Sequence, residues 1–82
     1  APLDLVPHGP DNVTVEGASE LRVLTEYFGT PLPGKPTDSV SLWVLEKVQR
    51  IPKSGETFLV DGLTVTVKRA TQRRILELDV SR

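Results

Sequence analysis

Hydrophobic residues recur along this chain at two different periods, and the change of period separates strands from helices. Residues 13–16 alternate apolar and polar side chains, as a half-buried strand does, and the alternation stops at Gly17. Residues 1–12 hold three of the seven prolines and show no sustained period. They are interpreted as a linker or loosely attached arm. The first predicted element is therefore a strand over residues 13–16.

A short amphipathic helix is predicted next, from Glu20 to Phe28. Apolar residues recur there at helical spacing, Ser19 is a suitable N-cap, and Gly29 supplies a C-terminal cap. Residues 30–36 contain three prolines and one glycine. Because prolines cannot continue a helix and disfavour a central strand, this segment is predicted to be a connecting loop.

A second helix is predicted from Val40 to Gln49, capped by Ser39 or Asp38. One face of it is apolar and collects Val40, Val44, Leu45, Val48 and Ile51. Trp43 flanks this apolar stripe, whereas Leu42 points away from its centre. Leu42 is therefore predicted to be surplus to the core.

The last third of the chain predicts three strands joined in a meander. Asp61-Gly62 between two alternating segments is typical of a two-residue hairpin, because a type I′ turn needs positive φ at both positions. A loop at residues 70–73 then leads to the third strand. The expected pairs are Val60 with Leu63, Phe58 with Val65, Glu56 with Val67, and then Leu76, Leu78 and Val80 opposite Val67, Val65 and Leu63.

These elements predict an α+β fold. The C-terminal meander and the N-terminal strand form a small antiparallel sheet, and the two helices pack on one face of it. Residues 1–12 are expected to be the arm and residues 13–82 the domain. With 82 residues the chain is one domain with a thin core, since a chain of this size buries only about 60% of its unfolded surface.

Composition narrows the classes of function. Ten basic and eleven acidic residues leave a formal net charge of -1, which argues against a nucleic-acid binder or an anionic-membrane binder. There is no cysteine, so disulfides, thiolate zinc sites and cysteine nucleophiles are excluded. No apolar run approaches the ~20 residues of a membrane span, and the start lacks the pattern of a signal peptide. The chain is expected to be cut from a larger protein.

Candidate catalytic and metal-binding residues are few. His8 is the only histidine and lies in the proline-rich arm, with no partner at the spacing of a triad, so it is interpreted as a solvated loop residue. Glu56, Asp61, Glu77 and Asp79 could approach a hard cation such as Mg²⁺ or Ca²⁺. The turn already accounts for Asp61, and the polar face of a strand accounts for Glu77 and Asp79. Neither a catalytic residue nor a metal site is predicted.

One local basic cluster is present, formed by Arg73 and Arg74 with Lys68 and Arg69 across the loop. It could meet a phosphate or an acidic partner surface, although exposed strand ends are the alternative interpretation. No glycine-rich phosphate-binding loop opens a strand-turn-helix unit.

Leu42 and Trp43 are the other candidates for an interaction surface. Tryptophan is enriched where interfaces are anchored, and an apolar residue away from the core stripe of a helix needs a partner. The alternative for Trp43 is that it widens the core face, because so small a domain has few other large side chains.

The order and spacing of several landmarks resemble the CorC/HlyC transporter-associated domain from Val13 to Val80. These landmarks are Gly17 after a short strand, Leu32-Pro33, the helix from Ser39 to Val48, Arg50-Ile51-Pro52, Gly55-Glu56, Gly62-Leu63, Val67 and Arg73-Arg74-Ile75. The sequence departs from the family pattern at Leu42 and Gln49, where the family usually has glycine.

This resemblance implies a non-enzymatic regulatory or interaction domain that follows a membrane region and a pair of CBS domains, in proteins linked to magnesium and cobalt efflux. The implied location is the cytoplasmic face of the cell membrane, with this part itself soluble and not inserted in the bilayer. The implied partners are the transporter's own CBS and membrane regions, or a second copy in a weak homodimer, and no nucleic acid. No cofactor is expected, but the fold is grouped with FAD-binding domains of oxidases. A flavin or adenine-nucleotide binding module is therefore the alternative.

Overall fold

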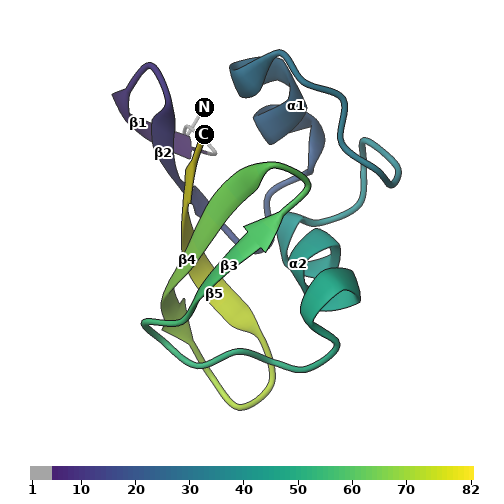
Figure 1. Ribbon diagram of the computed structural model, residues 1–82. Coiled ribbons are helices and arrows are strands. Elements are labelled where there is room, and N and C mark those ends of the chain that lie inside the picture. Colours follow the sequence, from purple (N-terminus) through teal and green to yellow (C-terminus); the bar gives the residue numbers. More distant parts are fainter. Residues whose placement is uncertain (1–4) are drawn as a thin grey trace.

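The computed structural model describes residues 5–82, which form five strands and two helices (Figure 1). The strands make one antiparallel sheet in the order β1-β2-β5-β4-β3. The predicted α+β class is confirmed. The elements are β1 Leu5–Gly9, β2 Asn12–Glu16, α1 Arg22–Phe28, α2 Val40–Val48, β3 Thr57–Val60, β4 Leu63–Ala70 and β5 Ile75–Ser81.

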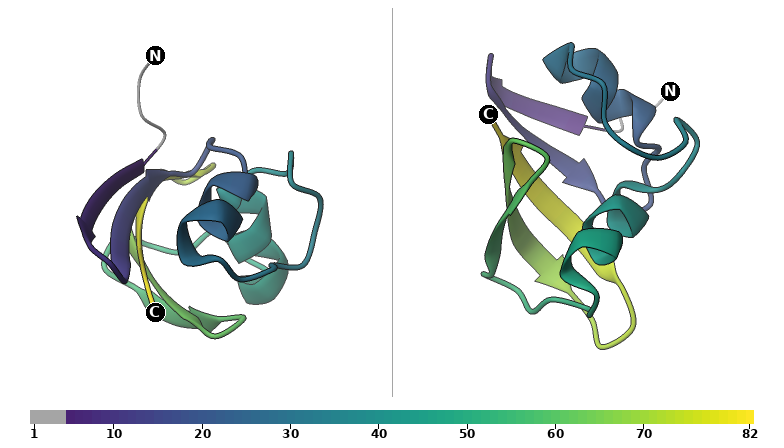
Figure 2. Two further views of the ribbon diagram at one scale, coloured as in Figure 1. Left: turned by 90° about the horizontal axis from the view of Figure 1, so that it is seen from above. Right: turned by 45° about the vertical axis from the view of Figure 1, so that its right-hand side comes forward.

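Both helices lie on the same side of the sheet, which curves around them when it is seen from above (Figure 2). The core forms between this concave face and the helices, since alternate residues of each strand point inward. Its members are almost entirely aliphatic, with one tryptophan and one phenylalanine: Val13, Val15, Leu21, Leu24, Phe28, Val40, Trp43, Val44, Val60, Leu63, Val65, Val67, Ile75, Leu78 and Val80.

The predicted Asp61-Gly62 hairpin is confirmed. Both residues have positive φ, 51° at Asp61 and 86° at Gly62, as a type I′ turn requires. The turn pairs Val60 with Leu63 and Phe58 with Val65, as expected. The main-chain N–H of Val67 donates to the carbonyl of Glu56 at 2.9 Å, which extends the same register one pair further.

The predicted register between β4 and β5 is wrong by two residues. Val65 pairs with Val80 and Val67 with Leu78, because the two strands run on together as far as the turn at residues 71–74. A shift of two keeps each side chain on its own face, so the expected burial of Leu78 and Val80 still holds. Bulges between Val67 and Ala70 change the alternation near the turn. As a result Ile75 is buried where Leu76 was expected.

The expectation of a loosely attached arm is wrong for the described residues 5–12. Leu5–Gly9 forms β1, which pairs antiparallel with β2 at one edge of the sheet. The hydroxyl of Tyr27 in α1 donates to the carbonyl of Gly9, which holds this edge against the helix. Residues 1–4 of the expected arm lie outside the described residues.

The expected N-cap of the first helix is also wrong. The helix begins at Arg22, and Ser19 is buried two residues before its N-cap, Leu21. Carbonyls of the loop that follows the helix satisfy the first amides instead, because Leu21 N–H donates to Asp38 at 2.7 Å and Arg22 N–H donates to Pro36 at 3.0 Å. The predicted C-cap is confirmed, since Gly29 is left-handed with φ 64°.

Helix α2 begins as predicted. Ser39 is its N-cap, and the Ser39 hydroxyl accepts the Leu42 N–H at 3.0 Å. At the other end Gln49 takes the left-handed C-cap conformation, with φ 62°. This conformation suits glycine, the residue that the resemblance leads us to expect at position 49.

Gly17 allows β2, β5 and α2 to meet closely. A Cβ atom at this position would lie 2.2 Å from the carbonyl oxygen of Ile75. Gly17 N–H donates to Leu76 at 3.0 Å, and its carbonyl accepts from Ser41 N–H at 2.9 Å. Only glycine fits here, because any side chain would collide with the main chain of β5.

Candidate interaction surface

Helix α2 presents one exposed apolar side chain. Val40, Trp43 and Val44 are buried against the sheet, whereas Leu42 is 40% exposed. Leu42 lies three residues after the N-cap, on the solvent side of the first helical turn. Its predicted position away from the core is confirmed. In a domain whose other apolar helix residues are mostly covered, this side chain marks a surface that could be covered by a partner.

Trp43 does not share this surface. Only 5% of it is exposed, and its indole N–H donates to the Asp61 carboxylate at 2.8 Å. The side chain thus joins α2 to the turn between β3 and β4. Of the two α2 candidates, the structure leaves only Leu42 accessible, and Trp43 fills the core.

The basic residues gather at the end of the sheet that holds the 71–74 turn and the loop after α2, at the bottom of Figure 1. Arg73 and Arg74 are exposed, and neither takes part in an ion pair within residues 5–82. Their amides donate to the Thr71 hydroxyl, both at 3.1 Å, which fixes the turn that carries them. Four of the ten basic residues, Arg50, Lys53, Arg73 and Arg74, lie in these two segments, and Lys68 and Arg69 lie at the adjoining end of β4.

Lys68 and Arg69 are partly neutralised. Both approach the Glu77 carboxylate, at 4.0 and 3.6 Å respectively. Of the six, Lys53, Arg73 and Arg74 take part in no ion pair within residues 5–82, and the exposure of the two arginines supports the interpretation that they could meet an acidic surface.

Arg50 and Glu56 close the loop that leads from α2 into β3. Two guanidinium nitrogens donate to the two carboxylate oxygens at 2.9 and 2.6 Å, and the Lys53 amide donates to the same carboxylate at 2.6 Å. Hydrogen bonding from Arg50 and then from the Lys53 amide lowers the pKa of Glu56 to about 2. This carboxylate is engaged in holding the loop.

His8 is not arranged for catalysis. Its Nε2 lies 2.6 Å from the Thr14 hydroxyl, and that hydroxyl donates to Asp79 at 2.5 Å. In a hydrolytic triad the imidazole lies between the carboxylate and the nucleophile. Here the hydroxyl occupies the middle position and its proton is already committed to Asp79.

The four acidic residues considered for a cation each have another partner. Glu56 binds Arg50, Asp61 accepts from Trp43, Glu77 meets Lys68 and Arg69, and Asp79 accepts from Thr14. Within residues 5–82, no group of three or more histidine, aspartate or glutamate side chains comes together to hold a metal ion.

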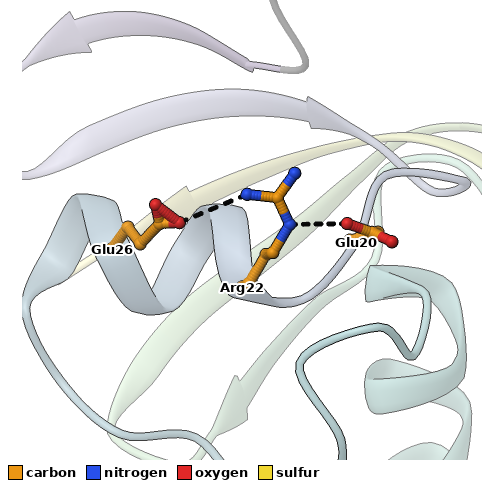
Figure 3. Close-up of polar contacts among 3 residues, drawn as sticks. All are labelled: Glu20, Arg22 and Glu26. Atoms are coloured by element: carbon orange, nitrogen blue, oxygen red, sulfur yellow. Dashed lines mark hydrogen bonds and ion pairs between the residues drawn. The ribbon is translucent and has the colours of Figure 1, made fainter.

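Arg22 lies between Glu20 and Glu26 on the outer side of α1 (Figure 3). Its Nε is 2.6 Å from Glu20, and a terminal nitrogen is 3.4 Å from Glu26. All three side chains are well exposed, so these pairs contribute little to stability and leave the helix face polar. The polar outer face of α1 contrasts with the apolar Leu42 on α2.

A shallow groove of about 440 Å³ lies at the basic end of the molecule. Its lining mixes apolar residues with one lysine: Ile51, Pro52, Lys53, Ser54, Ala70, Thr71 and Gln72. The groove lies between loops, and no helix N-terminus of the described residues opens onto it. It therefore lacks the arrangement with which dinucleotide-binding folds hold a pyrophosphate.

No helix of the part described, residues 5–82, is long and apolar enough to cross a membrane.

The sequence matches the profile of one protein family over nearly its whole length. The family profile of CorC_HlyC, the transporter associated domain, matches residues 6–82. The chain therefore belongs to the CorC/HlyC transporter-associated domain family, the domain of CorC and hemolysin-like proteins. No curated protein matches the sequence.

Solved structures agree with this assignment. A region associated with a Mg²⁺ and Co²⁺ transporter (CorC) from Neisseria meningitidis MC58 has a TM-score of 0.86 at 26% identity, over 96% of this chain and 98% of that chain. The CorC_HlyC domain from Nitrosomonas europaea has a TM-score of 0.87 at 18% identity, over 100% and 99%. The transporter associated domain of a CBS domain protein from Porphyromonas gingivalis has a TM-score of 0.77 at 24% identity, over 96% and 97%. These last two show the fold alone.

Proposed function

We propose that this chain is a non-enzymatic regulatory and interaction domain of a CBS-domain membrane transporter linked to magnesium and cobalt efflux. The observation that carries the proposal is the exposed Leu42 on a helix whose neighbouring apolar residues are buried. Covering a leucine side chain contributes roughly 1.5 to 3 kcal/mol, which suits a modest and reversible contact.

The partner proposed for this surface is the transporter's own CBS and membrane regions, on the cytoplasmic face of the membrane. Arg73 and Arg74 lie exposed at the basic end and give the domain a second point of contact, toward acidic side chains. An apolar contact supplies affinity, and the charges guide the orientation. Together they suit a domain that docks and undocks as the transporter changes state.

The arrangement of His8 among residues 5–82 supports a non-enzymatic role. His8 is the sole histidine, and its hydroxyl neighbour Thr14 donates to Asp79. Such a chain of hydrogen bonds stabilises the outer face of the sheet and does not activate a nucleophile.

The transport activity of the full-length protein tests the regulatory role. Leu42→Asp should change the rate of Mg²⁺ or Co²⁺ efflux from cells while the amount of protein in the membrane stays the same. Thr37→Asp is the matched control, because Thr37 is exposed in the loop before α2 and receives the same change of charge. Equal rates for the wild type and both variants would contradict a regulatory role for this surface.

A flavin or adenine-nucleotide binding module is the alternative function. The groove beside Lys53 is the observation that favours it, since a phosphate could meet the lysine there. Titration of FAD against Trp43 fluorescence separates the two functions. The interaction domain predicts no saturable binding at micromolar FAD, and saturable binding that Lys53→Ala removes would favour the alternative.

A further inference from the structure

The two edges of the sheet differ in how they are protected against pairing with another strand. β1 contains Pro7, which has no main-chain N–H to donate. The pairing of β1 with β2 is also interrupted by a bulge between Pro7 and Gly9. Prolines and bulges are the common devices that block an exposed edge. β3 has neither device. Its four residues, Thr57, Phe58, Leu59 and Val60, include no charge, no proline and no glycine.

The hydrogen-bond pattern shows which main-chain groups of β3 face outward. In an antiparallel pair, hydrogen-bonded and non-bonded positions alternate. Glu56 is bonded to Val67, and two residues further on Phe58 faces Val65 in the same kind of pair. The amides and carbonyls of Thr57 and Leu59 therefore point away from β4. Among the described residues, no hydrogen bond outside the sheet ladder involves the main chain of Thr57 or Leu59.

Leu59 adds an apolar side chain to this open edge. It is 71% exposed, the largest exposed fraction among the bulky apolar residues described, and lies on the face opposite the core, because its neighbours Phe58 and Val60 pack toward the core. A free row of donors and acceptors next to a bare leucine fits the addition of one more strand.

We propose that β3 pairs antiparallel with β3 of a second copy of this chain, forming a weak dimer with one continuous sheet. A two-fold axis through Phe58 would set Thr57 against Leu59 of the second copy, and the reverse. Each of these two pairs exchanges both of its N–H···O=C bonds, which satisfies all the outward groups.

The second copy is the occupant that the sequence of β3 favours. A symmetric antiparallel pair duplicates every charge of the strand on both sides of the axis, so in a strand this short a charged side chain would lie near a like charge. Residues 57–60 carry none. The contact is short, which makes the dimer weak and concentration-dependent. It uses the edge of β3 and not helix α2, and it does not depend on the proposed regulatory function.

Sedimentation velocity of this chain over about ten micromolar to about one millimolar tests the proposal. The wild type should form a reversible dimer. Leu59→Lys should remain monomeric with unchanged circular dichroism, because it removes the apolar contact and places two like charges close to the axis. Leu42→Asp is the matched control and should still dimerise.

Amide hydrogen exchange provides an independent readout of the same contact. The Leu59 amide should become protected from exchange as the protein concentration rises, whereas the exchange rates of the β1 amides, at the opposite edge, should not change. A wild type that stays monomeric at millimolar concentration would overturn the proposal, as would a dimer that survives Leu59→Lys. A dimer lost in Leu42→Asp and kept in Leu59→Lys would show that the copies meet through α2.

Discussion

The indole N–H of Trp43 donates to the Asp61 carboxylate at 2.8 Å, joining helix α2 to the β3–β4 turn. Asp61 therefore has two roles, since it also adopts the positive φ that the type I′ turn requires. The bond orients α2 on the sheet and so sets the direction in which Leu42 points.

Removal of this acceptor should destabilise the fold. Asp61→Gly keeps a residue that accepts positive φ but leaves the buried indole N–H without a partner, at a cost of about 1–2 kcal/mol in the free energy of unfolding. Asp61→Asn is the control, because Asn-Gly also suits the turn and retains a carbonyl acceptor. Urea denaturation measures both. Equal losses in the two variants would show that the charge matters more than the hydrogen bond.

Gly17→Ala should be among the most damaging single substitutions. The added methyl would meet the Ile75 carbonyl at 2.2 Å, so β2 or β5 must move, and the hydrogen bonds to Leu76 and Ser41 weaken. We expect a loss of about 2–3 kcal/mol in the free energy of unfolding. Gly9→Ala is the matched control, since nothing lies within 4 Å of a Cβ there. A Gly17→Ala variant with unchanged thermal stability would contradict this close packing.

Gln49→Gly should stabilise the chain. Gln49 is a non-glycine residue in the left-handed conformation, and glycine adopts that conformation without the steric cost. The gain in the free energy of unfolding should be about 0.5–1 kcal/mol, after the greater flexibility of glycine in the unfolded chain is included. Gly29→Ala makes the opposite change at the C-cap of α1 and should lower stability by a similar amount. A loss of stability in Gln49→Gly would contradict this explanation.

Acid should weaken the loop between α2 and β3. The pKa of Glu56 is lowered to about 2 in the folded chain, from an ordinary value of 4.5, chiefly by the hydrogen bonds from Arg50. A lowered pKa means that the carboxylate stabilises the fold above about pH 4.5, and that this contribution is lost as the pH falls toward 2.

The difference in unfolding free energy between the wild type and Glu56→Gln should therefore be constant above pH 5 or so and shrink below it. In an Arg50→Gln background the same comparison should lose most of this pH dependence. A difference that stays constant down to pH 2 would show that the pair does not affect folding stability.

The sequence predicted those elements whose causes are local. Asp61-Gly62 determines its hairpin because positive φ is required within two residues. Ser39 caps α2 with its own hydroxyl, and the exposure of Leu42 follows from its position on the helical wheel. These predictions needed no knowledge of distant contacts.

The sequence could not reveal features that depend on distant partners. β1 shows no alternation because it is an edge strand whose middle residues are exposed on both sides. The burial of Ile75 in place of Leu76 results from bulges in the β4–β5 ladder, which the residue pattern does not encode. Ser19 suited an N-cap by type, but the Leu21 and Arg22 amides bond to the 30–38 loop instead.

The net charge of -1 does not reveal that the positive charges are unevenly distributed over the molecule. The cations collect at one end of the sheet, because the loop after α2 and the 71–74 turn meet there in space. Composition alone could not show that Arg73 and Arg74 remain free while Lys68 and Arg69 share Glu77.

The central claim is that Leu42 contacts the rest of the transporter. The direct measurement is the dissociation constant between this chain and the CBS region of the same protein, for the wild type, Leu42→Asp and Thr37→Asp. An acidic residue in the first turn of α2 suits the helix dipole, and α2 has none there, so Leu42→Asp should fold normally. We predict that Leu42→Asp raises the dissociation constant about tenfold or more, whereas Thr37→Asp leaves it unchanged. An equal dissociation constant for a folded Leu42→Asp and the wild type would contradict the claim.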